Sequence, residues 1–135
     1  MSKRVFFVLT SHDRKGPESA TNAVPSGFYL SEVTHPRRFL TDAGYSVDYV
    51  SPKGGKCHAD GLNLDDPVNA AFGRTPELRS AAETTKRLSQ VDPEEYAAIF
   101  YAGGHATMWD FSDNAALASI AARIYERGGV VSAAC

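Results

Sequence analysis

The chain has 135 residues, and its 14 Lys and Arg residues against 16 Asp and Glu residues give a formal net charge of −2. This balance gives no electrostatic reason to expect a nucleic acid or an anionic membrane as partner, and no apolar run is long enough to span a bilayer. Two cysteines provide no disulfide framework and fit a reducing compartment, so we expect a cytoplasmic protein with a single domain over residues 1–135.

The first third of the chain predicts a strand, a long loop and a helix. Residues 4–10 form an apolar run typical of a buried strand. Glycine, proline and polar residues then predict a loop over residues 11–26, and long loops inside compact domains are often functional. Residues 27–43 favour a helix with a broken apolar face, which Pro36 would bend or split.

The middle of the chain predicts two more strands and a second helix. Residues 45–50 alternate between apolar and polar side chains, as in a strand. Residues 53–69 are rich in Gly, Asp, Pro and Asn and predict an extended surface segment. The pair Thr75–Pro76 predicts the start of a helix that runs to about residue 90, and residues 96–101 predict a third buried strand.

The last third repeats this alternation. Asp113 is expected to cap a helix that reaches residue 127, and an apolar run then starts a buried strand that ends at Cys135. Alternating strands and helices predict an α/β fold with a mostly parallel sheet. Ligands of such sheets bind beyond the carboxyl ends of the strands, where Gly103, Gly104 and Cys135 all fall.

A strand that stops at a cysteine among small residues is typical of a nucleophile elbow. Taken alone, however, Cys135 is more simply explained as a buried, inert thiol. The pair Gly103–Gly104 would let its amides approach a developing oxyanion, although two glycines by themselves more often make a plain turn. The sequence thus offers a nucleophile and an oxyanion site, with a structural alternative for each.

Glu32 lies among apolar residues near the start of its predicted helix. Such surroundings favour the protonated carboxyl, which can share a proton with a thiol and so stabilise the thiolate. The simpler explanation for Glu32 is a solvated helix face. The four histidines show no metal-ligand spacing, and we expect neither a metal nor a cofactor.

Four motifs, in order, resemble the ThiJ/PfpI superfamily, which is class I glutamine amidotransferase-like, in its heat-shock-chaperone and glyoxalase III-like branch. They are GFYLSEVTHP (27–36), SPKGG (51–55), GGHATMWDF (103–111) and SAAC (132–135). The resemblance implies a flavodoxin-like three-layer α/β sandwich and a homodimer. It also implies Cys135 as nucleophile, Glu32 as its proton partner, and Gly103, Gly104 and His105 beside the oxyanion or substrate.

Two departures accompany this resemblance. Ala106 stands where the family commonly has a glycine, which is expected to tighten the loop after His105. Family members also continue past the cysteine, usually with a histidine, an elbow helix and an acidic partner for that histidine. We therefore expect these residues to be the N-terminal part of a longer protein, with the C-terminal remainder as a partner.

The function that the resemblance implies is a cofactor-independent, glyoxalase III-like lyase of the D-lactate dehydratase type. It would convert methylglyoxal or a related dicarbonyl into a 2-hydroxy acid through a hemithioacetal on Cys135. Three alternatives remain open: a stress-response chaperone, a cysteine-dependent hydrolase or amidotransferase-like enzyme, and a redox sensor.

Overall fold

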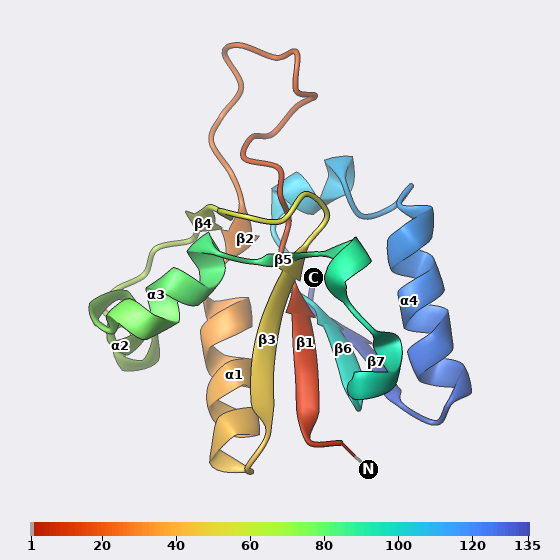
Figure 1. The fold of residues 1–135 in the computed structure, drawn as a ribbon. Helices are drawn as coiled ribbons and strands as arrows, with labels where there is room; N and C mark the ends of the chain where they lie inside the picture. Colours follow the sequence, from red (N-terminus) through yellow and green to blue (C-terminus); the bar gives the residue numbers. More distant parts are fainter. Residues whose placement is uncertain (1) are drawn as a thin grey trace.

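Strands and helices alternate along residues 2–135, the part of the chain that the computed structural model describes (Figure 1). In chain order the strands and α-helices are β1 (Arg4–Val8), β2 (Phe28–Tyr29), α1 (Ser31–Asp42), β3 (Ser46–Ser51), β4 (Ala59–Asp60), α2 (Pro67–Arg74), α3 (Pro76–Glu83), β5 (Lys86–Arg87), β6 (Ala98–Tyr101), α4 (Ala115–Glu126) and β7 (Val130–Ala133). Short 3-10 helices are η1 (Leu88–Gln90), η2 (Pro93–Glu95) and η3 (His105–Trp109).

Five of the strands form one parallel sheet in the order β5-β3-β1-β6-β7. The first strand of the chain therefore lies at the centre, with Val5 opposite Val47 of β3 on one side and Ala98 of β6 on the other. Because all five strands run in the same direction, their carboxyl ends lie along a single edge of the sheet. The predicted α/β fold with a parallel sheet is confirmed.

The core lies on both faces of this sheet. Side chains of β1 alternate: Val5 and Phe7 pack with α1, α2 and α3, whereas Phe6 and Val8 pack with α4. The sheet is therefore the middle of three layers, with α1 and α4 on opposite sides of it in Figure 1. This is the flavodoxin-like sandwich that the resemblance implied.

The helix predicted over residues 27–43 begins later than expected. Phe28–Tyr29 forms β2, which pairs with the distant β4, and the Phe28 and Leu30 amides donate to carbonyls of that segment. Helix α1 starts at Ser31 and continues unbroken through Pro36. The correction has a tertiary cause, because the partner that draws these residues out of the helix lies some thirty positions later in the sequence.

Two predictions between residues 53 and 90 are wrong. The segment expected to be extended contains β4 and the start of α2, where the Asp66 side chain caps the helix by accepting from the amides of Val68 and Asn69. The next helix ends at Glu83, because Thr85 instead exchanges backbone hydrogen bonds with Gly55. The residues that follow Thr85 pair with β3 as the edge strand β5.

The C-terminal helix and strand also differ in detail from expectation. Asn114, not Asp113, caps α4, and its side chain accepts from the Leu117 amide at 3.0 Å. In the described residues β7 is the last strand of the sheet order, and its Val130 and Val131 are 59% and 41% exposed. Across residues 2–135, no helix has the length and apolar character required to cross a membrane.

Candidate active site

Gly103 is the point where three of the predicted site residues meet. It follows β6 at the carboxyl edge of the sheet. A Cβ atom built on Gly103 would lie 2.5 Å from Cys135 Cβ and would overlap Glu32 Oε2. Cys135 Cβ and Glu32 Oε2 thus both lie within 2.5 Å of the position that this Cβ atom would occupy, and so within twice that distance of each other. Strands β6 and β7 and helix α1 therefore bring Gly103, Cys135 and Glu32 together.

Glu32, the second residue of α1, contributes a carboxyl group without a partner. Its Oε2 atom is buried and has no hydrogen bond within the described chain. The neighbouring Leu30 and Val33 are almost fully buried, which confirms the apolar surroundings expected around this residue. A buried carboxyl oxygen that lacks a donor is costly, so this atom has room for a hydrogen bond to a ligand or a neighbouring donor.

Cys135 is exposed in the described part of the chain. Its φ angle is 70°, and within residues 2–135 no other residue except glycine has a positive φ. Non-glycine residues rarely adopt this conformation, and such strain tends to occur at functional sites. The buried thiol is Cys57, whose pKa burial raises, so that it stays protonated and unreactive.

Gly104 holds the turn after β6 against β2. Its φ is 137°, and a Cβ atom there would overlap the Gly27 carbonyl and lie 3.1 Å from Phe28 Cα. The Gly103 carbonyl accepts from the Tyr29 amide at 2.8 Å. Because β2 leads directly into α1, this backbone contact fixes the start of α1 beside the turn. Within the described residues neither glycine amide donates a hydrogen bond, which leaves both available to a ligand oxygen.

His105 is less closely tied to this cluster. It is exposed at the start of η3, and within residues 2–135 it bonds to neither Glu32 nor Cys135. Ala106, which was expected to tighten the loop, is fully buried inside η3 without a positive φ. An alanine methyl group is therefore accommodated there.

Two of the four histidines have hydrogen-bond partners within the protein. His12 bonds to the Gly16 carbonyl and His35 bonds to Asp66 at 2.8 Å. Across the described residues 2–135, no group of three His, Cys, Asp or Glu side chains gathers as a metal site would require.

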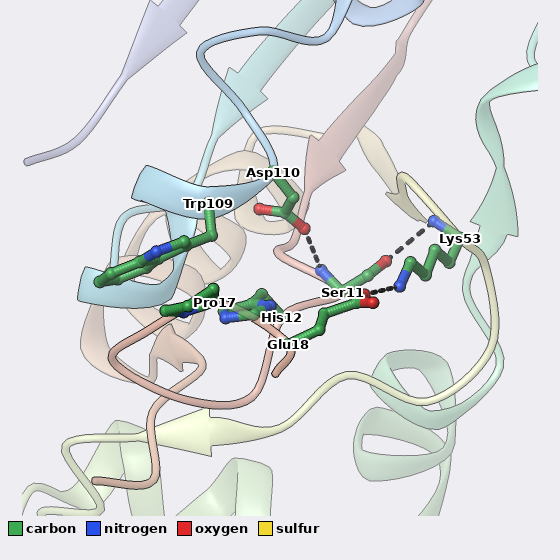
Figure 2. Close-up of a pocket in the computed structure, with 7 residues that line it drawn as sticks. All are labelled: Ser11, His12, Pro17, Glu18, Lys53, Trp109 and Asp110. Atoms are coloured by element: carbon green, nitrogen blue, oxygen red, sulfur yellow. Dashed lines mark hydrogen bonds and ion pairs between the residues drawn. The ribbon is translucent and has the colours of Figure 1, made fainter. Parts of the chain in front are cut away.

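The long loop after β1, which rises above the sheet in Figure 1, forms a separate hollow (Figure 2). This pocket of about 250 Å³ contains none of the five predicted site residues; its lining is Ser11, His12, Pro17, Glu18, Lys53, Trp109 and Asp110. The Asp110 carboxylate accepts from the Thr10 hydroxyl at 2.7 Å and the Ser11 amide at 2.8 Å, and Lys53 pairs with Glu18. Polar groups of this pocket are thus used to hold the loop in place.

Comparison with known proteins places these observations in a family. The DJ-1/PfpI family model matches residues 19–135. Glyoxalase 3 of Candida albicans is 28% identical over 137 residues, which covers 98% of this chain and 57% of that protein. The chain therefore spans little more than half the length of this curated relative.

Two solved structures extend the comparison to the fold. The crystal structure of Rapid Encystment Protein 24 KDa from Francisella tularensis superposes with a TM-score of 0.89 at 36% identity, covering 100% of this chain and 59% of that one. Glyoxalase III from Candida albicans superposes with a TM-score of 0.83 at 28% identity, covering 98% of this chain and 56% of that one. With a family model that matches most of its length and neighbours that share its three layers, the chain belongs to the DJ-1/PfpI family.

Proposed function

We propose that the protein is a cofactor-independent, glyoxalase III-like enzyme that converts methylglyoxal or a related dicarbonyl into a 2-hydroxy acid. The observation that carries this proposal is the meeting of a buried, unpartnered carboxyl oxygen on Glu32 with an exposed, strained Cys135 around Gly103. The name of the Candida relative agrees with it. Because the chain spans 57% of that relative, the activity is proposed for the whole protein.

The first step forms a bond between Cys135 and the substrate. The Cys135 thiolate attacks the aldehyde carbon, the carbonyl electron pair moves to oxygen, and a proton gives the hemithioacetal. Glu32 is placed to take the thiol proton and return it to that oxygen. The amides of Gly103 and Gly104, which donate no hydrogen bond in the described residues, would stabilise the negative charge that develops on oxygen.

The next steps rearrange the hemithioacetal and add one water molecule. Glu32 removes the proton from the former aldehyde carbon and delivers it to the neighbouring carbon, while the hydroxyl proton passes from the first oxygen to the second by way of an ene-diol. The product is a thioester of a 2-hydroxy acid on Cys135. Water then cleaves the C–S bond, which releases lactate when methylglyoxal is the substrate and restores the thiol. No oxidant or reductant is consumed, because one carbon is oxidised while its neighbour is reduced.

Methylglyoxal turnover by the natural full-length protein tests this proposal. Cys135→Ala is expected to abolish activity, because it removes the attacking atom. Glu32→Gln is expected to lower kcat by about 100-fold or more, because it removes the proton carrier. Cys57→Ala is the matched control and should retain activity, since this buried thiol lies outside the site. Equal rates in wild type, Cys135→Ala and Glu32→Gln would overturn the proposal.

One observation favours chaperone activity as a second candidate. Leu62 and Leu64 are 64% and 55% exposed, and they border an apolar pocket of about 270 Å³ that also includes Phe28 and Phe72. Exposed apolar side chains around a hollow can bind unfolded segments. Suppression of client aggregation should then survive Cys135→Ala but weaken in Leu64→Glu. Suppression that is unchanged in Leu64→Glu would contradict this assignment.

A further inference from the structure

The polar side chains at the start of α1 divide into two groups. Ser31, Thr34 and His35 all bond to the segment formed by residues 63–69, whereas the buried oxygen of Glu32 has no bond. At about 100° per residue, the first three share one face of the helix and Glu32 lies roughly a quarter turn away. The face of α1 toward α2 therefore carries the hydrogen bonds that hold the helix in place. Glu32 lies off this face, and its Oε2 atom lies beside Gly103 and Cys135.

Asn69 is the centre of these contacts. It is fully buried, its carbonyl oxygen accepts from the Thr34 hydroxyl, and its amide donates to Ser31 Oγ at 2.9 Å and to the Asn63 carbonyl at 3.0 Å. The Asn69 side chain is thus hydrogen-bonded to α1 at Ser31, directly before Glu32, and at Thr34, two positions after it. A buried amide with its bonds satisfied fixes one geometry, because each alternative leaves a buried polar group unpaired.

Asp66 makes a second connection between the same two segments. One carboxylate oxygen caps α2, and the other bonds to His35 Nε2 at 2.8 Å. The hydrogen bond from His35 lowers the pKa of Asp66, so this carboxylate is charged at neutral pH. The start of α2 is therefore tied to α1 at two successive turns.

The start of α1 has reason to need such support. Its N-cap position is Leu30, which provides no side-chain cap. Pro36 has no N–H group and cannot donate to the Glu32 carbonyl four residues earlier. The turn that carries Glu32 thus lacks two of the bonds that usually hold a helix start.

We infer that Asn69 is a positioning residue that holds Glu32 against Cys135, an inference that rests on the function proposed above. Asn69 does not touch the reacting atoms; it acts through Ser31 and Thr34 on the turn that carries the carboxyl group. Removing these hydrogen bonds leaves Cys135 in place but moves Glu32, its proton partner. The turnover rate is therefore expected to fall through kcat more than through KM.

Substitutions of Thr34 test the grip with the least disturbance of the core. Thr34→Val keeps the shape of the side chain but removes the hydroxyl that bonds to Asn69, and is expected to lower kcat about tenfold with KM changed less than twofold. Thr34→Ser keeps the hydroxyl and should restore most of the rate. Thr41→Val, near the other end of α1, removes a hydroxyl that bonds within its own helix and serves as the matched control.

A double-mutant cycle separates positioning from a general loss of structure. The rate of Cys135 alkylation by iodoacetamide is measured for wild type, Thr34→Val, Glu32→Gln and the double variant, each in the natural full-length protein. If Asn69 acts through Glu32, Thr34→Val slows alkylation several-fold in the wild-type background and less than twofold in the Glu32→Gln background. Equal effects in both backgrounds, or an effect no larger than that of Thr41→Val, would overturn the inference.

The alkylation readout also distinguishes this inference from the proposed function. Alkylation needs only the thiol and its proton partner, so it reports on positioning whether or not methylglyoxal is the substrate. A protein that fails to turn over methylglyoxal but shows the expected cycle would refute the proposed substrate and retain the role of Asn69. A protein that turns over methylglyoxal but shows no coupling in the cycle would support the proposed substrate and refute the role of Asn69.

Discussion

Two regions at the same edge of the sheet use their polar groups in opposite ways. In the pocket of Figure 2, the Asp110 carboxylate receives two hydrogen bonds and the His12 ring bonds to a backbone carbonyl. Around Gly103, by contrast, the Glu32 carboxyl has a buried oxygen with no donor, and Cys135 holds a strained backbone conformation. The first region stabilises a loop, whereas the second retains unsatisfied groups that a ligand can use.

This difference shows why a hollow alone is a poor guide to the reaction in this fold. The carboxyl edge of a parallel sheet gathers loops from every strand, so several hollows can form there. The pocket beside Trp109 is large enough for a small ligand, yet its carboxylate and imidazole groups are engaged within the protein. Unpaired buried polar atoms and strained residues therefore indicate the reactive position better than volume does.

The largest effect is expected from filling the empty point between the two reactive groups. Gly103→Ala would place a methyl group 2.5 Å from Cys135 Cβ and against Glu32, which must force them apart. Turnover and Cys135 alkylation should both fall, turnover by about 100-fold or more. Gly73→Ala is the control, because its methyl would meet only Leu64 at an ordinary 3.8 Å. A folded Gly103→Ala protein with wild-type rates of turnover and alkylation would show that the space beside Gly103 is not the reactive position.

A smaller effect, on stability and not on reactivity, is expected from the satisfied region. Thr10→Val removes the hydroxyl that donates to Asp110 and accepts from the His12 amide at 3.1 Å. The partly buried Asp110 and the buried His12 amide then each lose a hydrogen bond, so the free energy of unfolding in urea should fall by about 1–3 kcal/mol. Cys135 alkylation in the folded protein should stay within twofold of wild type. A large loss of alkylation would show that the two regions are coupled.

The smallest effect expected is the pH dependence that Asp110 adds to stability. Burial raises the pKa of Asp110 above its ordinary value of 3.8, so the native state keeps this proton to a higher pH than the unfolded state does. The contribution of Asp110 to the free energy of unfolding should therefore fall as pH rises through the range just above 3.8.

Asp110→Asn has no such proton, so the stability of wild type relative to this variant should decrease between about pH 4 and about pH 6. Urea unfolding at both pH values measures that difference. The change is expected to be smaller than that caused by Thr10→Val. Identical differences at the two pH values would show that Asp110 titrates as an ordinary exposed carboxyl.

Several parts of the fold could be predicted because their signals are local. The apolar runs that became β1 and β6, and the alternating residues that became β3, indicate strands without knowledge of any partner. The fold class followed from the alternation of elements, and the resemblance pointed to Glu32, Gly103 and Cys135, which the structure brings together. One signal was available but overlooked: Asp66–Pro67 starts α2 in the same way that Thr75–Pro76 starts α3.

Other parts depend on contacts between distant segments and carry no local signal. Lys86–Arg87 became an edge strand only because β3 offers its open edge, and Phe28–Tyr29 left the predicted helix only because β4 lies beside it. Strand propensity is weak and depends on the neighbouring strands, so two-residue strands of this kind cannot be predicted from the sequence. The role inferred for Asn69 is of the same kind, since an asparagine in a polar segment looks like any other turn residue.

The sequence by itself determined which residues are apolar, where four of the five strands of the central sheet run, and which side chains are able to exchange protons or attack a carbonyl. Tertiary structure alone decided that a carboxyl group from α1 and a thiol just after β7 both lie beside Gly103. It also decided that Asn69 bonds to the first turn of α1, which carries that carboxyl group. The physical reason is range. Periodicity and backbone preference act over a few residues, whereas the position of a reactive atom depends on packing between segments that lie far apart in the sequence, as Glu32 and Cys135 do.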